Sequence, residues 1–356
     1  MFTLKSVNSF RRRFMRQLTK NIGSDYLIQS EENLRALNIE RVLICRPNHR
    51  LGNLLLIMPL IDEVSFLLPN CKIDLFIKGN LGPIIFKNYD NVDNIMHLPR
   101  KPLKELLKYF WVWISVKSKH YDLVINVVDK SSSGRLVTKI SDSKYKTYCD
   151  DNENLKANVE NFEHMAKRPI YCLRNYLKKL GFAEKKRSIP SINLKLDAFE
   201  LAHGLKIINK LVKNDLKIIC IFTYATDDKC YSKTWWLNFY DKLKVTFPSY
   251  NIIEILPVEN LSMINFKAPS FYSKDIREIA AVIANTAVFI GADSGIMHLA
   301  SAAQVPVVGL FSRANQAEYQ PYNNNSIAVD TNQIDALGCI EIVETILKSK
   351  HVEMAL

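Results

Sequence analysis

Glycine is scarce in this sequence, with 11 among 356 residues, and no G-x-G-x-x-G run occurs. That run supplies the tight turn and the close backbone approach that a dinucleotide pyrophosphate needs, so this fingerprint is excluded. The sequence also contains no Walker-type phosphate loop and no recognisable Ser/His/Asp arrangement. Three common routes to nucleotide binding or hydrolysis are therefore absent.

Long hydrophobic runs are missing as well. The most apolar cluster, Tyr109 to Val116 (YFWVWISV), is far shorter than the roughly 20 residues that a membrane-spanning helix needs. The basic N-terminus does not contain the apolar segment of a secretory signal. We therefore expect a cytoplasmic protein without membrane spans.

Cysteine pairs spaced as C-x-x-C are absent, and the seven cysteines are an odd number. This usage favours reduced thiols in the cytosol and disfavours a zinc site. Asp150-Asp151 resembles half of an acidic metal-binding motif, but it lies in a charged segment and we interpret it as solvated. We expect no metal site.

Positive charge is abundant, and it is concentrated in the first half of the chain. The net charge is +12; residues 1–190 contain 33 Lys and Arg against 19 Asp and Glu, whereas residues 191–356 contain 15 against 17. This asymmetry indicates that the first half of the chain binds an anionic partner. The candidates are an anionic membrane surface, a phosphorylated glycolipid and nucleic acid. The alternative is a solvated surface that keeps the protein soluble. Nucleic acid is disfavoured because the basic residues are not interleaved with aromatics in a recognisable module.

Residues 1–40 form a basic N-terminal extension. Within it, Phe10 to Ile22 (FRRRFMRQLTKNI) predicts either a short amphipathic helix suited to anionic lipid headgroups or a flexible tail. The rest of the chain alternates between apolar runs of strand length and longer runs of helical spacing, which is typical of α/β domains with parallel sheets.

This alternation predicts two Rossmann-like domains, residues 41–185 and residues 186–333, followed by a C-terminal segment 334–356. The last helix is expected at 334–348. The expected strands are 41–47, 73–77, 95–98, 123–128, 218–222, 252–256, 288–290 and 306–311. The expected helices are 53–68, 103–117, 159–180, 198–212, 235–247, 275–285 and 296–303.

Val288 to Phe311 (VFIGADSGIMHLASAAQVPVVGLF) predicts a strand, a loop, a helix and a second strand. In open parallel sheets ligands bind beyond the carboxyl ends of the strands, and a helix N-terminus suits a phosphate. Ser294 adds a hydroxyl there, Gly295 permits close approach, and His298 lies on the same helix face. We expect Asp293 to hold a sugar hydroxyl or position the loop. The alternative is that these side chains only cap the helix and that the histidine is a core residue.

The run GADSGIMHLASAAQVPVVGLF resembles the signature of glycosyltransferase family 9, the ADP-heptose:lipopolysaccharide heptosyltransferases. With the two further matches below, the resemblance covers about residues 41–345. It implies a GT-B architecture, with two Rossmann-like domains facing across a cleft, in which the last helix, 334–348, would pack back toward the first domain. It also implies inverting, metal-independent sugar transfer with a nucleotide sugar as substrate and no cofactor.

The second match is Arg41 to Leu60 (RVLICRPNHRLGNLLLIMPL), which resembles the family's N-terminal pattern, a strand followed by R-x-x-x-x-G-D and a later Pro-Leu. Arg46, Gly52 and Pro59 fit it in kind. Asn53 stands where the family carries an Asp that is assigned as the general base.

An asparagine has no basic site at neutral pH, so Asn53 orients a hydroxyl at most. His49, in the same loop, is the nearest replacement, because an imidazole is partly neutral and basic at pH 7. Arg46 and Arg50 favour an anionic acceptor or the phosphates. The alternative is that the loop only binds.

The third match lies within Ile219 to Leu243, where Thr223, Lys233 and Trp235 fit a strand, a polar loop and K-x-W before a helix. A lysine there neutralises a leaving diphosphate, and the hydroxyl of Thr223 or Thr226 donates to it. Trp235 and Trp236 are interpreted as core anchors rather than stacking platforms.

Two further residues have open roles. The resemblance suggests that Glu259 binds the ribose hydroxyls, and the alternative is a solvated loop side chain. Arg313, in a loop that departs from the family pattern, is a candidate phosphate contact.

The function predicted from all of this is transfer of a sugar, with heptose from ADP-heptose as the family's precedent, to an anionic glycolipid of lipopolysaccharide or surface polysaccharide. The partners would be the donor, the glycolipid and the anionic inner-membrane surface, to which the cytoplasmic protein would bind peripherally. Two alternatives remain open: a GT-B nucleotide-sugar epimerase, and a non-catalytic sugar-nucleotide-binding protein, which Asn53 favours.

Overall fold

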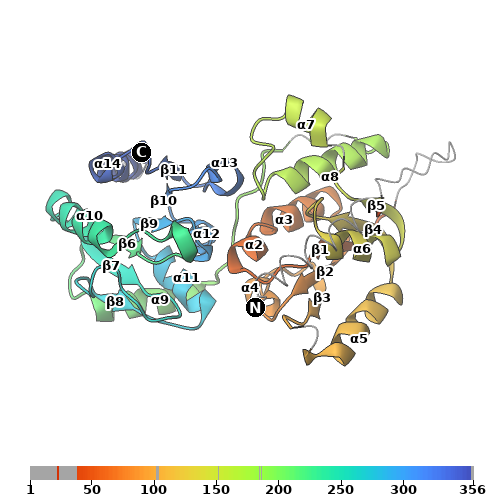
Figure 1. Ribbon diagram of the computed structural model, residues 1–356, viewed down its shortest axis with the longest axis horizontal. Helices are drawn as coiled ribbons and strands as arrows, with labels where there is room; N and C mark the ends of the chain where they lie inside the picture. The colour runs from red at the N-terminus through yellow and green to blue at the C-terminus, as the bar shows by residue number, and fades with distance from the viewer. Residues whose placement is uncertain are drawn as a thin grey trace, which may run out of the picture. The chain divides into compact units, whose positions relative to one another are not determined.

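The computed structural model describes residues 22–23, 38–101, 104–150, 152–183, 185 and 187–353. The chain divides into two units, each with its own parallel sheet (Figure 1). The first unit comprises Met1–His49 and Pro59–Pro190, and the second comprises Arg50–Met58 and Ser191–Leu356. This division differs from the expected boundary at 185/186, because a nine-residue segment from early in the chain makes most of its contacts with the second unit.

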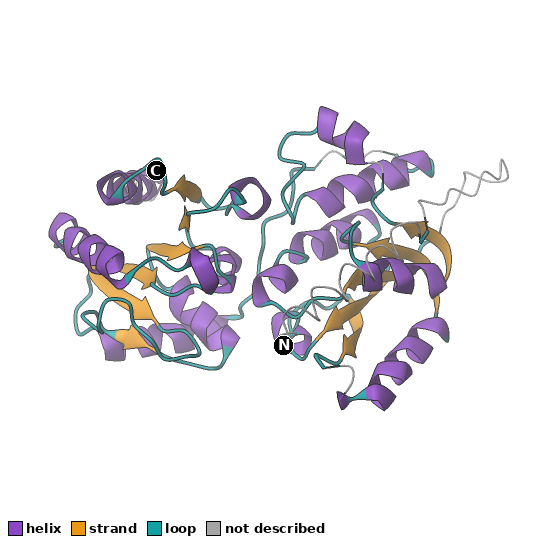
Figure 2. Ribbon diagram, in the orientation of Figure 1, coloured by secondary structure: helices purple, strands orange, loops and turns teal. Residues whose placement is uncertain are grey.

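The first unit contains five parallel strands in the order β3-β2-β1-β4-β5. In the central strand, Ile44 is paired with Leu75 on one side and Ile125 on the other. Helices cover both faces of this sheet (Figure 2). The strands are β1 (Arg41–Arg46), β2 (Lys72–Lys78), β3 (Val92–Leu98), β4 (His120–Asn126) and β5 (Asp142–Thr147).

Helices of the first unit follow the strands as a Rossmann-like fold requires. The expected helix 53–68 is interrupted, and its first part, α2 (Leu51–Leu55), belongs by contacts to the second unit. The others are α3 (Met58–Leu67), α4 (Gly82–Ile85), α5 (Leu106–Lys117), α6 (Ser132–Ile140), α7 (Asn152–Asn158) and α8 (Arg168–Lys179).

The second unit contains six parallel strands in the order β11-β10-β9-β6-β7-β8. The chain builds outward from β6 through β7 to β8, then crosses back to β9 and builds outward again, so the direction reverses between β6 and β9. The strands are β6 (Ile218–Phe222), β7 (Asn251–Ile255), β8 (Ser270–Phe271), β9 (Val288–Ala292), β10 (Val307–Phe311) and β11 (Ile327–Asp330). Together the two sheets confirm the predicted pair of Rossmann-like domains.

A large apolar core of the second unit is built from its strands and from two of its helices, Lys233–Thr246 and Ala336–Glu353. Trp236 is fully buried in it and Trp235 packs against it, which confirms the two tryptophans as core anchors. The helices are α9 (Ala198–Leu211), the 3-10 turn η2 (Asp227–Lys229), α10 (Lys233–Thr246), α11 (Ile276–Ala284), α12 (Gly295–Ala302), α13 (Gln316–Tyr319) and α14 (Ala336–Glu353).

The C-terminal helix α14 packs within the second unit. It contributes Cys339, Ile340 and Val343 to the core of that unit and packs beside α10. The expected packing of this helix toward the first domain stays a prediction.

Three strands were not expected from the sequence: β5, β8 and β11. All lie at sheet edges or beside them and are short or polar, as in Asp142–Thr147 (DSKYKT). A strand exposed on one side has no continuous apolar run, so its sequence resembles a loop. No helix in the described part of the chain is both long and apolar enough to cross a membrane.

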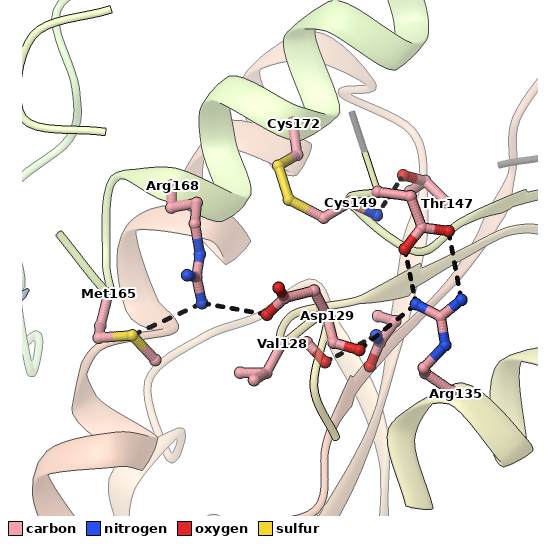
Figure 3. Close-up of a disulfide and its surroundings, with 10 residues drawn as sticks. Val128, Asp129, Arg135, Thr147, Cys149, Met165, Arg168 and Cys172 are labelled. Carbon is pink, nitrogen blue, oxygen red and sulfur yellow. Dashed lines mark hydrogen bonds and ion pairs between the residues drawn. A yellow bond between two sulfur atoms is a disulfide. The ribbon is translucent and has the colours of Figure 1, made fainter. Parts of the chain in front are cut away.

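The expectation that all cysteines are reduced is wrong for one pair. Cys149, after β5, and Cys172, on α8, form a disulfide with Cα atoms 5.3 Å apart (Figure 3). The other five cysteines are free. Sequence spacing did not indicate this pair, because its members are 23 residues apart and meet only through packing of α8.

Asp150 is exposed, as the interpretation of a solvated side chain expects, and it also forms an ion pair. Its carboxylate accepts from Arg135 Nη1 at 2.6 Å, and that guanidinium is buried (Figure 3). Arg135 also donates to the backbone carbonyls of Asp129 and Gly23. The aspartate therefore neutralises a buried cation. Asp151 lies outside the described residues.

We predict that Gly204→Ala destabilises the protein. A Cβ at Gly204 would collide with the carbonyl of Ala281, because α9 and α11 pack backbone to backbone there. Overpacking of this kind costs about 1–3 kcal/mol, more than the roughly 1 kcal/mol that alanine contributes through helix propensity. Urea unfolding measures the change.

Gly338→Ala in α14 is the matched control. Its Cβ would meet a side-chain methyl of Ile334 at 2.7 Å, which can move, and Oδ1 of Asp335 at 3.6 Å, which is an ordinary contact. We expect this variant to be neutral or slightly stabilised. Equal unfolding midpoints for the two variants would show that the contact between α9 and α11 is not tight.

Candidate functional site

The candidate site lies at the carboxyl end of the second sheet, where the strand order reverses. The loop that begins at Thr223 follows β6, and Asp293 and Ser294 follow β9, the neighbouring strand. Ligands of doubly wound sheets bind at this switch point, because the loops on its two sides diverge to opposite faces. The two segments that the sequence singled out in this unit thus follow adjacent strands.

Helix α12 begins directly at this point. Ser294 is its N-cap, and the hydroxyl accepts a hydrogen bond from the backbone N–H of Met297 at 3.2 Å. The capping role considered from the sequence is therefore real. It leaves the hydroxyl proton available, and the helix start retains its positive dipole end.

Close packing of α2 explains the glycine that begins α12. A Cβ at Gly295 would lie 3.2 Å from the Cβ of Leu51 and 3.4 Å from the backbone nitrogen of Gly52. A Cβ at Gly52 would in turn lie 2.7 Å from Cδ2 of His298. Both glycines therefore serve close approach between α2 and α12 inside the second unit.

Asp293 is held in an ion pair. It is 7% exposed; Lys229 Nζ lies 2.5 Å from its Oδ2, and Asn315 Nδ2 donates to the same oxygen at 2.7 Å. Lys229 comes from η2 after β6, and Asn315 precedes α13 after β10. Loops from three adjacent strands therefore converge on one carboxylate. With its charge compensated, Asp293 repels an anion at the helix start less than a lone carboxylate would.

His298 is a buried neutral imidazole. Burial lowers its pKa to about 4; Asp293 opposes that shift and Lys229 adds to it. Within the described residues Nδ1 has no hydrogen-bond partner, although the side chain is 97% buried. The ring centroid lies 6.2 Å from that of Tyr319 on α13. His298 is thus not a satisfied core histidine, and its free nitrogen suits a polar ligand group.

The side chain of Thr223 is buried beneath the loop and is hydrogen-bonded within the protein. Its hydroxyl donates to Glu254 at 2.6 Å and accepts from the backbone N–H of Met263 at 3.1 Å. Glu254 also accepts from Ser262 at 2.7 Å, and burial raises the pKa of its carboxyl group. Thr223 belongs to this buried network beneath the loops, and its role in binding a donor stays a prediction.

The remaining predicted donor residues have exposed side chains. Lys233 is the first residue of α10, Thr226 is the N-cap of η2 without a side-chain cap bond, and Glu259 follows β7. The negative charge of Glu259 is the largest cause of a raised pKa at Tyr224, so the loops after β6 and β7 approach each other. Arg313, after β10, forms an ion pair with Asp228 of η2.

In the first unit, Arg46 ends β1 and is 7% exposed. His49 is exposed, and a Cβ at Gly79, which follows β2, would lie 3.3 Å from its Cβ. The division between units falls directly after His49, so Arg50 and Asn53 belong to the second. Among the residues that the structure describes, no three His, Cys, Asp or Glu side chains gather as metal ligands would.

Sequence reasoning missed Lys229, Asn315 and Tyr319. Lys229 stands four residues before Lys233 in the loop TYATDDKCYSK, so the loop was identified but not this lysine, and the role of Lys233 in donor binding stays a prediction. Asn315 and Tyr319 carry no sequence signal, because only the fold brings them to Asp293 and His298.

The chain is similar in sequence and fold to known glycosyltransferases. Residues 273–349 match the model of glycosyltransferase family 9 (heptosyltransferase). The chain is similar to lipopolysaccharide heptosyltransferase 3 of Escherichia coli, with 22% identity over 296 residues, covering 78% of this chain and 85% of that protein.

Two solved structures share the fold. A family 9 glycosyl transferase from Veillonella parvula has a TM-score of 0.70 at 17% identity, covering 88% of this chain and 98% of that one. E. coli heptosyltransferase WaaC with ADP has a TM-score of 0.62 at 15% identity, covering 86% and 99%. The predicted resemblance, the GT-B fold and the glycosyltransferase class are confirmed.

We predict that His298 makes stability depend on pH. Its pKa is lower in the folded protein than in the unfolded chain, so the unfolded chain binds the proton first and stability falls as the pH drops from about 6.5 toward 4. Relative to His298→Gln, the wild type should lose on the order of 2 kcal/mol between about pH 7 and about pH 5. Urea unfolding at several pH values measures this, and parallel pH curves would contradict it.

Proposed function

We propose that this chain, a glycosyltransferase of family 9, moves a sugar from a nucleotide diphosphate donor to an anionic glycolipid. Heptose from ADP-heptose is the proposed donor, and lipopolysaccharide or a related surface polysaccharide is the proposed product. Transfer proceeds with inversion and without a metal. The observation that carries the proposal is the convergence of Lys229, Asp293 and the start of α12 at the switch point of the second sheet.

The donor diphosphate binds at the start of α12. Backbone N–H groups and the helix dipole favour negative charge there, and Ser294 supplies a hydroxyl. Lys229, which neutralises Asp293, is the cation beside this position. As the glycosidic bond to the leaving diphosphate breaks, negative charge grows on the phosphate oxygens, and a positioned cation stabilises that transition state.

Asp293 and His298 bind the uncharged part of the donor. A carboxylate only accepts hydrogen bonds, so Asp293 is suited to sugar hydroxyls. The neutral imidazole of His298 offers Nδ1 to a hydroxyl or an amide without adding charge beside the diphosphate. Glu259, exposed after β7, is the proposed partner of the ribose hydroxyls.

His49 is the proposed general base. It removes the proton from the acceptor hydroxyl as that oxygen attacks the anomeric carbon and the nucleotide diphosphate leaves. Its exposure after β1, at the carboxyl edge of the first sheet, supports this role. Asn53 orients the hydroxyl, and Arg46 and Arg50 contribute positive charge for an anionic acceptor.

Asn53 also supports a second candidate function, which is binding of a sugar nucleotide with little or no turnover. Without the family's carboxylate, the acceptor loop binds but lacks its usual base. Transfer activity measured with ADP-heptose and a glycolipid acceptor separates the two functions, because ADP binding without turnover on any acceptor would favour the second.

The proposed location is the cytoplasmic face of the inner membrane. The basic residues of the first half would attract the protein to anionic lipid, where its acceptor resides. The predicted amphipathic segment Phe10 to Ile22 falls outside the described residues except for Ile22.

We predict that Lys229→Met weakens ADP binding by about tenfold or more, the size expected when a charge-assisted contact is lost. Lys233→Met is the matched control, because Lys233 is exposed at the first turn of α10 and we expect it to change the affinity little. Calorimetric titration with ADP measures both. Normal binding by Lys229→Met, or an equal loss in both variants, would contradict this assignment.

A second prediction concerns the base. His49→Ala should lower kcat by about 100-fold or more, as removal of a general base typically does, with little change in ADP affinity. Asn53→Ala should keep most of the activity. Asn53→Asp in the His49→Ala background should restore part of it, because the new carboxylate can accept the proton. Full activity in His49→Ala would rule out His49 as the base.

A further inference from the structure

The outer face of helix α5 is an exposed apolar surface. Leu107 is 80% exposed, Phe110 60%, Trp111 65% and Ile114 54%, and Leu106 lies beside them. Their spacing of i, i+3, i+4 and i+7 places them on one side of the helix. We call these five residues the outer face of α5.

The opposite side of α5 already anchors the helix to the first unit. Tyr109, Val112 and Trp113 pack against the core, and Val116 is fully buried in it. The ring of Trp113 meets that of Phe76 on β2 edge to face, with centroids 5.7 Å apart. Because the inner side holds the helix, the fold does not need apolar residues outside. A surface helix ordinarily carries polar residues there.

Positive charge surrounds the outer face. From Arg100 to Lys119 the sequence contains six Lys and Arg and a single acidic residue, Glu105. Lys104 and Lys117 are exposed near the two ends of the helix, whereas Lys119 is engaged by Asp74 at 3.0 Å. An apolar face bordered by lysines is complementary to a surface that is anionic outside and apolar beneath.

We infer that the outer face of α5 docks on an anionic lipid bilayer. Phe110, Trp111 and their aliphatic neighbours enter the boundary between headgroups and acyl chains, and the lysines lie at the lipid phosphates. A second copy of the chain is a poorer occupant, because a two-fold contact would bring the same basic residues of both copies together. The inference adds a docking surface to the proposed membrane location. It rests on the proposed function only in that the acceptor is taken to be a glycolipid.

Another exposed aromatic residue, on helix α9, lies in an acidic setting instead of a basic one. Phe199 on α9 is 81% exposed, but its neighbours in the sequence include Asp197 and Glu200, which form the capping box of that helix. An acidic setting of this kind is not complementary to anionic lipid. Phe199 is therefore a matched control for an exposed aromatic that does not enter the bilayer.

The test is co-sedimentation of the full chain with vesicles of equimolar phosphatidylcholine and phosphatidylglycerol, compared with phosphatidylcholine alone. We expect binding to the anionic vesicles, a loss of about tenfold or more in Trp111→Glu, and no change in Phe199→Glu. Lys104→Gln with Lys117→Gln should weaken binding mainly at low salt, since the electrostatic part is screened.

Trp111→Phe reports the depth of insertion. It should bind the anionic vesicles as the wild type does but lose most of the tryptophan quenching by brominated lipid, because the other tryptophans face the protein. Unchanged ADP affinity in Trp111→Glu would show that the fold and the donor site are intact. Membrane docking is then judged separately from sugar transfer.

Three results would overturn the inference. Vesicle binding by Trp111→Glu as tight as that of the wild type would assign binding to another part of the chain. Equal binding to both vesicle types would remove the electrostatic basis. Absence of vesicle binding, together with self-association that Trp111→Glu abolishes in sedimentation equilibrium, would identify a second copy as the occupant.

Discussion

The ion pair between Asp293 and Lys229 is the interaction on which the candidate site depends. A buried carboxylate is tolerated only when it is paired and hydrogen-bonded, and Asp293 has both a lysine and the amide of Asn315. These partners come from the loops after β6 and β10, on either side of β9. One carboxylate therefore fastens three loops together beside the start of α12, and it keeps a cation where an anionic ligand needs one.

Close packing between α2 and α12 also shapes the candidate site. Gly52 and Gly295 let α2 lie directly against α12, and the ring of His298 is enclosed by Gly52. That enclosure keeps the imidazole neutral, since burial disfavours its charged form. The acceptor loop suggested by the sequence resemblance thus continues into a helix that belongs to the second unit. His49 and Asn53 stand on the two sides of this division.

Periodic apolar patterns predicted the fold well where strands are central. Val42 to Cys45 and Ile218 to Phe222 are buried throughout and were identified as strands. Edge strands such as β5 were missed, because a polar strand receives its conformation from a neighbour and not from its own side chains. The pairing of Cys149 with Cys172 and the ion pair of Asp150 with the buried Arg135 were missed for the same reason, as each depends on a contact between separate segments of the chain.

The sequence by itself determined the alternation of strands and helices, the strand–loop–helix that places Asp293 and Ser294 at a helix start, and the family resemblance. These are local properties, set by side-chain periodicity and by turn residues. Only the tertiary structure decided that Lys229 pairs with Asp293, that Nδ1 of His298 has no hydrogen-bond partner among the described residues, and that α5 is apolar on its outer face. Such features depend on which surfaces are brought together or left uncovered, and local spacing does not contain that information.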